Sequence, residues 1–319
     1  VLFLGELTIV KCNFGSVEDR VNMKMRDGIY EVWEKGRNNS TKPNFQWYIK
    51  SKFISKLIHE CSDCGWVDIE HEYYSYLKNL IPNPQVQFVS GSPETIETLN
   101  RDFEILKSAL VEYLKTIRSD MHIQEMDRIT GLNSLSHLEI KSGANFKFVN
   151  FNYTNTIERY MNYHFIENQI NIKYSVTNIH GQLADNNIIF GYGDESDKHY
   201  ESIEELNNPA FLKHFKHFQY LMNNNYREID EFVNSDPFDI FVLGLSCGLS
   251  DRVLLKYIFE HKKCNRIKII HHEREDGSDD FMDVSQNISR YFSLNNRQSF
   301  RTRIICFDKK NKMPQLKKK

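Results

Sequence analysis

The chain has 319 residues, of which 41 are basic and 43 are acidic, and its formal net charge is −2. This length suits one large domain or two ordinary ones, either of which buries about 70–75% of the unfolded surface. The balanced charge excludes a bulk electrostatic attraction to nucleic acid or to an anionic membrane. We therefore expect no strong nucleic-acid signature, and any polyanion site has to be local.

Six cysteines are thinly spread along the chain, which is typical of proteins from a reducing compartment. No apolar run approaches the ~20 residues of a membrane helix, and no basic-then-apolar leader opens the chain. We expect a cytoplasmic protein. Cys61 and Cys64 have zinc-ligand spacing, but no second pair completes a tetrahedral site, so we expect no metal.

The first half of the chain is predicted to be helical. Aromatic and aliphatic residues recur at helical spacing through residues 48–81, where they predict two helices that end before Pro82. Ser92-Pro-Glu-Thr is a helix start signal, and the apolar residues that follow repeat every three or four positions. They predict a long amphipathic helix at roughly 94–120.

Short β-rich segments then predict three strands, each of which ends in a polar or glycine turn. These strands are Phe146–Phe151, then Tyr174–Ile179 before His180-Gly181, and Ile188–Phe190 before Gly191-Tyr-Gly193.

The remaining elements alternate between helix and strand. They are helices near 210–223 and 226–233, a buried strand at 239–243, a loop at 244–250, a helix at 251–261 and a strand at 266–270. Strands interleaved with helices predict an α/β fold with a mostly parallel sheet, whose ligands bind beyond the carboxyl ends of the strands. The turns after the strands all lie at that edge.

The segment from Phe151 to Glu158 carries polar side chains where a strand gives way to a helix, among them Asn152, Thr154 and Asn155. Asn and Thr are good helix caps, so an ordinary cap is one interpretation. The polar groups are more numerous than a cap requires, and a binding site is the other interpretation.

His180 follows a predicted apolar strand directly and precedes Gly181. A histidine in such a place is more often a satisfied structural group than a catalyst. A glycine next to it would however let a ligand approach closely, and a histidine at a strand end is well placed to act as a general base.

The loop from Gly244 to Asp251 joins a buried strand to a helix and contains two glycines and two serines. Such a loop presents backbone N–H groups, which commonly hold phosphate or ribose. Ser250 and Asp251 would also suit a purely structural helix start. The loop is not a Walker motif, and Gly191-Tyr-Gly193 is only part of a dinucleotide fingerprint.

Together these segments resemble the AbiH family of bacteriophage abortive-infection proteins. The matching stretches are Trp66–Glu70, Phe151–Glu158, Ile179–Gly181, Ile188–Gly193 and Leu243–Asp251. The family in turn is similar to sirtuin-like proteins, so the resemblance implies a Rossmann-like (sirtuin-like) fold with a helical insertion or cap, and NAD as substrate or ligand.

By the same resemblance, Asn152 and His180 are the catalytic residues, with Asn152 near the nicotinamide ribose. The residues implied to bind the nucleotide are Gly5, Thr154, Asn155, Gly191, Gly193, Gly244, Ser246 and Asp251. Thr154 stands where sirtuin-like proteins often have Asp.

We expect four regions along the chain. They are an altered or degenerate N-terminal strand region at 1–45, a helical insertion or cap at 46–142, an α/β nucleotide-binding core at 143–307 and a basic tail at 308–319. The altered N-terminus is expected because the chain begins with Val1, and because Glu6 and Leu7 stand where the family has Asn and Gly.

The leading functional hypothesis is an anti-phage protein that binds and hydrolyses NAD or a related nucleotide. One alternative is a nucleotide-binding sensor or interaction module of phage defence without catalysis, and another is a degenerate copy that keeps only the fold. A phage or host trigger protein is a possible partner, and the protein could form an oligomer. We expect Asn152, His180 and Ser246 to converge on one crevice with Gly191 and Gly244 near its floor. Neither Asn152 nor His180 is expected to fill the core.

Overall fold

The structure is a computed structural model of the 319-residue chain. It describes residues 30–34, 45–49, 51–60, 66–81, 95–120, 145–155, 157–158, 161, 173–185 and 187–313. The chain divides into two compact units, one formed by Val1–Tyr113 with Ser202–Lys213 and the other by Leu114–Glu201 with His214–Lys319. None of the helices in the described ranges combines the length and the apolar character that a bilayer crossing needs.

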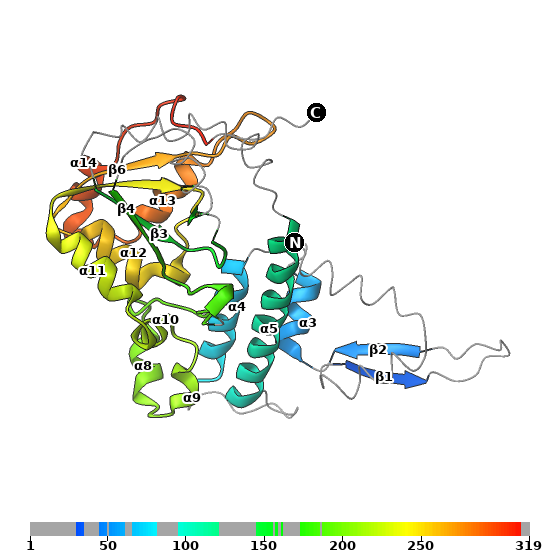
Figure 1. The fold of residues 1–319 in the computed structure, drawn as a ribbon. Coiled ribbons are helices and arrows are strands. Elements are labelled where there is room, and N and C mark those ends of the chain that lie inside the picture. Colours follow the sequence, from blue (N-terminus) through cyan, green and yellow to red (C-terminus); the bar gives the residue numbers. More distant parts are fainter. Residues whose placement is uncertain are drawn as a thin grey trace. The chain divides into compact units, whose positions relative to one another are not determined.

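The first unit contains a strand pair and a group of helices (Figure 1). Strand β1 (Tyr30–Glu34) pairs antiparallel with β2 (Phe45–Ile49), a pairing that the sequence patterns did not predict. The predicted helices of the first half are confirmed as α3 (Lys52–Glu60), α4 (Trp66–Asn79) and α5 (Ile96–Asp120). The short helix α9 (Pro209–Leu212) also belongs to this unit, and α8 (Tyr200–Glu205) begins two residues before its boundary.

Aromatic side chains at helical spacing hold α3, α4 and α5 together. Tyr73 and Phe103 lie with ring centroids 4.2 Å apart, and Phe53 contacts both rings. The buried hydroxyl of Tyr73 donates to Oδ1 of Asn100 at 2.7 Å, and burial together with the charge of Glu104 raises the pKa of that hydroxyl. The same periodic residues that predicted the helices therefore form their common core.

The second unit carries two parallel strand pairs. Strand β3 (Asn145–Asn150) pairs with β4 (Lys173–Asn178), and β5 (Phe238–Leu243) pairs with β6 (Cys264–Ile270). The expected single sheet is wrong for the described residues, since the two pairs form separate two-stranded sheets. The parallel direction of both pairs agrees with the prediction, whereas the Rossmann-like, sirtuin-like arrangement stays a prediction.

Two of the expected elements differ in the second half of the chain. Ile188–Phe190 is not a strand, because its backbone bonds to the turn after β4, with Ile189 N–H donating to His180 O at 2.8 Å. The helix expected near 210–223 is broken after α9, because Phe215 has extended backbone and bridges to Tyr192. After this break follow α10 (Lys216–Gln219) and a turn of 3-10 helix.

The other helices of the second unit cover its strands. They are α11 (Asn225–Ser235), α12 (Arg252–Glu260), α13 (Phe281–Ser289) and α14 (Arg297–Arg303), together with the 3-10 turns at Leu183–Asp185, Tyr220–Met222, Leu249–Asp251 and Leu294–Asn296. The first two correspond to the helices predicted near 226–233 and 251–261.

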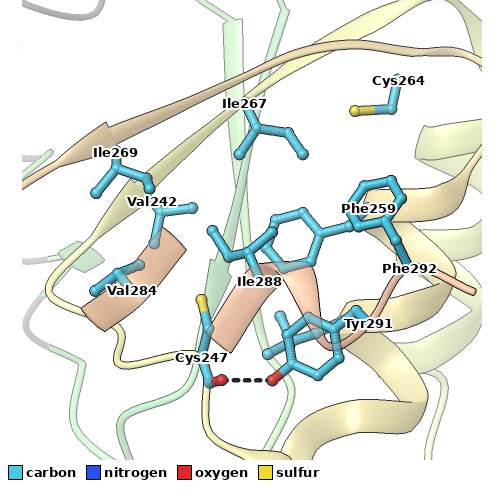
Figure 2. Close-up of a cluster of buried hydrophobic side chains, with 11 residues drawn as sticks. Val242, Cys247, Phe259, Cys264, Ile267, Ile269, Val284, Ile288, Tyr291 and Phe292 are labelled. Carbon is cyan, nitrogen blue, oxygen red and sulfur yellow. Dashed lines mark hydrogen bonds between the residues drawn. The ribbon is translucent and has the colours of Figure 1, made fainter. Parts of the chain in front are cut away.

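Two apolar clusters form the core of this unit. One lies between β5, β6, α12 and α13 and includes Ile267, Ile288 and Tyr291 (Figure 2). The other joins the end of β4 to α11 and α12. Phe151, from the end of β3, packs against both clusters, as do Phe238 and Ile240 of β5. The two strand pairs thus share a continuous core although they do not pair with each other.

Candidate functional site

The loops after β3 and β4 meet the start of α12 at the imidazole of His180. This side chain is 5% exposed. Its Nε2 lies 2.8 Å from Oδ1 of Asp251, and its Nδ1 lies 3.2 Å from the carbonyl oxygen of Phe151. Both ring nitrogens are therefore engaged within the protein, and the expectation that His180 lies outside the core is wrong.

Asp251 is the centre of a buried charge cluster. The ammonium group of Lys216, at the start of α10, donates to the same Oδ1 at 2.8 Å, and the Lys216 side chain is 1% exposed. Burial raises the pKa of Asp251, but the attraction of Lys216 and His180 outweighs it and holds this pKa below the usual range. Asp251 is thus an ionised, paired carboxylate.

The sequence patterns did not single out Lys216 or Tyr220. The hydroxyl of Tyr220 lies 3.4 Å from Nε2 of His180, and Lys216 meets the same cluster through Asp251. The two residues are four positions apart, the spacing of neighbours on one helix face. This spacing does not distinguish a buried lysine from a solvated one on the helix predicted near 210–223, so it did not reveal the pairing of Lys216 with Asp251.

A chain of side-chain amides runs across the carboxyl ends of β3 and β4. The amide of Asn150 donates to Oδ1 of Asn178 at 2.6 Å, and the backbone N–H of Asn152 donates to Oδ1 of Asn150 at 3.0 Å. Asn178 donates in turn to Oε1 of Glu158 at 2.7 Å, and Gln182 donates to the same oxygen at 2.9 Å. The polar residues after β3 thus form a connected network.

Within this network Asn152 is exposed, whereas Thr154 and Asn155 are half-buried. The carbonyl oxygen of Thr154 accepts a 3.0 Å bond from the amide of Asn150. Asn152 is therefore the predicted catalytic side chain that solvent can reach, and Asn150 fixes the backbone on both sides of it.

The glycines of Gly191-Tyr-Gly193 serve close backbone packing. A Cβ atom on Gly191 would lie 1.9 Å from the carbonyl oxygen of His214, and one on Gly193 would lie 2.9 Å from that of Ser250. The N–H of Val253 also donates to the carbonyl oxygen of Gly193 at 3.0 Å. Protein backbone thus occupies the space beside Gly191 that was expected to form a crevice floor.

The loop from Gly244 to Ser250 is held through its carbonyl groups. The amide of Asn287 donates to the carbonyl oxygen of Ser246 at 2.8 Å. The hydroxyl of Tyr291 lies 2.6 Å from the carbonyl oxygen of Cys247 (Figure 2) and 2.8 Å from that of Gly248. Gly244 and Cys247 both adopt positive φ, at 62° and 54°.

The backbone N–H groups of this loop, unlike its carbonyl groups, are not engaged by the other described residues. Within the part of the chain that the structure describes, the backbone N–H groups of Ser246, Cys247 and Gly248 donate no hydrogen bond. Gly244 and Ser246 are exposed. Carbonyl groups fixed toward the protein together with unused N–H groups are the arrangement from which anion sites are built.

A groove of about 750 Å³ lies elsewhere in the second unit, on β5, β6 and residues 305–311. None of the predicted site residues lines it, and its Arg266 is already paired with Asp239 at 2.5 Å. We place the candidate site at the His180 cluster because three loops and the buried charges meet there. Gly5, like the Cys61–Cys64 segment, lies outside the described residues.

Comparison with known proteins shows the family to which the chain belongs. The sequence profile described as Bacteriophage abortive infection AbiH matches residues 31–272. The chain therefore belongs to the AbiH family of bacteriophage abortive infection proteins. The matched range includes every candidate site residue except Gly5. No curated protein and no solved structure matches the chain, and the similarity to sirtuin-like proteins stays a prediction.

Proposed function

We propose that this AbiH-family chain acts in anti-phage abortive infection by binding NAD or a related nucleotide at the carboxyl ends of β3, β4 and β5, where it hydrolyses the nicotinamide bond. The observation that carries the proposal is the meeting of the three strand-end loops at His180. Its ring joins the residue before Asn152 to Asp251, at the end of the loop that follows β5. Strand-end loops are where α/β proteins hold nucleotides.

The donor set suits such a ligand. The unused N–H groups of residues 246–248, with the start of α12 close behind them in the chain, fit the phosphates of a nucleotide. The negative charge of Asp251 does not oppose this, because the ammonium group of Lys216 lies 2.8 Å from its Oδ1. The amide of Asn152 is exposed and donates to Oδ1 of Asn150 at 3.3 Å, and its carbonyl oxygen and second N–H would contact a ribose or a water molecule.

The hydrolysis would add water across the bond between nicotinamide and ribose, giving nicotinamide, ADP-ribose and a proton. Asn152 would orient the ribose and the water, which lowers the entropic cost of bringing them together. His180 would act mainly as a positioning residue, because its Nδ1 holds the carbonyl of Phe151, the residue next to Asn152. Its role as a general base, implied by the family resemblance, requires that a bound nucleotide release one of its nitrogens.

A second candidate function is favoured by the same histidine. Since both ring nitrogens of His180 are engaged and the ring is 5% exposed, the cluster lacks an accessible imidazole base. A sensor that binds the nucleotide and signals infection without hydrolysis needs only the binding groups.

One experiment separates the two functions. The purified protein is mixed with NAD, and nicotinamide release is followed by chromatography while binding is measured by calorimetry. Hydrolysis predicts turnover that falls by about 10²–10⁴-fold in Asn152→Ala, with no change in Asn265→Ala, which alters an exposed asparagine on β6. Binding without turnover supports the sensor. Neither binding nor turnover contradicts both.

A further inference from the structure

We propose that Glu158 is a specificity residue that accepts hydrogen bonds from ribose hydroxyl groups of the nucleotide, an inference that rests on the proposed function. Glu158 lies in the segment that follows β3, and among the residues that the structure describes only one of its two carboxylate oxygens accepts hydrogen bonds. Its Oε1 accepts from Asn178 at 2.7 Å and from Gln182 at 2.9 Å. Its Oε2 is buried and has no hydrogen-bond partner.

This asymmetry is unfavourable for the protein alone. A buried acceptor without a donor loses its hydration and gains nothing in return. Asn178 and Gln182 are neutral amides, and within the described residues no lysine or arginine forms an ion pair with Glu158. We infer that a bound ligand supplies the donor that Oε2 lacks.

The chemistry of the neighbours points to a hydroxyl donor. Both amides direct N–H groups at Oε1 and so fix the orientation of the carboxylate, as is usual for a residue that recognises a ligand by geometry. A carboxylate held in this way can accept from the hydroxyl groups of a ribose, the same use that acidic residues have in dinucleotide-binding folds.

Glu158 is also connected to the candidate catalytic residue. From Glu158, hydrogen bonds lead through Asn178 to Asn150, and Asn150 accepts from both the backbone N–H and the side-chain amide of Asn152. A ribose that bonds to Glu158 would thus be recognised by the network that positions Asn152. We assign Glu158 to the ribose nearest Asn152, which is the ribose of the bond to be cleaved.

The test compares NAD with its 2′-deoxy and 3′-deoxy analogues at the nicotinamide ribose, using calorimetry on the full chain. For the unchanged protein, we expect at least one of these analogues to bind about tenfold to a hundredfold more weakly than NAD, the scale of one hydrogen bond to a charged group. Glu158→Gln should weaken NAD by a similar factor while leaving the affinity for that analogue unchanged. Glu231→Gln, which alters an exposed glutamate on α11, is the matched control.

The outcomes are distinguishable. If the unchanged protein binds NAD and Glu158→Gln binds it equally well, the role of Glu158 is wrong while the proposed function stands. If Glu158→Gln weakens NAD and the analogues alike, the residue is structural. If the unchanged protein binds no NAD, both proposals are wrong. Glu158→Asp, which keeps the charge but retracts the carboxylate, serves as a second variant, and thermal unfolding verifies that each variant is folded.

Discussion

His180 and Asp251 are 71 residues apart in the sequence, and their side chains lie 2.8 Å apart in the second unit of the fold. One follows β4 and the other precedes α12, so the contact ties together two strand-end loops that belong to different strand pairs. Because Lys216 donates to the same carboxylate oxygen, the contact is part of a buried ion cluster with consequences for stability.

The first prediction concerns the ion pair itself. Lys216→Met should destabilise the protein by about 3–5 kcal/mol, because it leaves a buried carboxylate with less compensation. The double variant Lys216→Met/Asp251→Leu should recover part of that loss, because it also removes the carboxylate that Lys216→Met leaves without its ammonium partner. Urea unfolding of both variants measures the difference, and Lys312→Met, at an exposed pair with Glu273, should change stability by less than about 1 kcal/mol. If Lys216→Met lowers the unfolding free energy no more than Lys312→Met does, Lys216 does not stabilise a buried Asp251 carboxylate.

The second prediction is a pH dependence set by Asp251. Its pKa is lower in the folded protein than in the unfolded chain, where an ordinary Asp titrates at about 3.9. The stabilisation is thus complete above that value and is lost as the pH falls below it toward the folded pKa. Between pH 5 and pH 3 the unfolding free energy should fall more steeply for the unchanged protein than for Asp251→Asn. Parallel curves for the two proteins would show that the carboxylate is not held in its ionised form.

The third prediction compares the stability effects of replacing the two candidate catalytic residues, of which Asn152 is exposed and His180 is buried. Asn152→Ala should change stability by less than about 1 kcal/mol because its side chain is exposed. His180→Ala removes a buried ring that contacts Phe151 and Asp251, and should cost about 2–4 kcal/mol. Thermal unfolding of both variants is the measurement. If His180→Ala is as stable as the unchanged protein, the ring does not hold the three loops together.

The fourth prediction concerns the hydroxyl of Tyr291, which donates to the carbonyl oxygens of Cys247 and Gly248. Tyr291→Phe should destabilise the protein by about 1–3 kcal/mol, because buried carbonyl groups lose their donor. Urea unfolding measures this loss, and amide hydrogen exchange at Asp251 should rise, because its N–H donates to the carbonyl oxygen of Gly248 at 3.3 Å. Nucleotide affinity should fall as well. Phe292→Leu, a change in the same cluster that removes no hydroxyl, is the control, and should affect stability without selectively increasing exchange at Asp251.

Periodicity and turn chemistry predicted much of the local structure. Helices α3, α4 and α5 and strands β3 to β6 were all indicated, because apolar residues at helical spacing mark the helices and short β-rich segments mark the strands. The strand at Ile188–Phe190 was wrong, since its three buried side chains look like a strand in sequence but its backbone pairs with the His180 turn. Patterns of residues report burial, and they do not report which backbone groups pair.

The site was predictable only in part. His180 and Asp251 were both singled out by their positions at strand and helix ends. Neither position indicates that Lys216, which follows the extended residue Phe215, donates to Asp251. The separate strand pairs were equally hidden, because an alternation of helices and strands fixes direction but not sheet membership.

The anchoring of the loop from Gly244 to Ser250 has a consequence for how the family region is delimited. The family profile ends at residue 272, yet Asn287 and Tyr291, which secure the carbonyl groups of that loop, follow it on and just after α13. A chain shortened to the matched region would retain every residue of the loop and lose both side chains that shape it. Recombinant fragments for ligand binding should therefore extend beyond Phe292, and homologues are best compared over α13 as well as over the matched motifs.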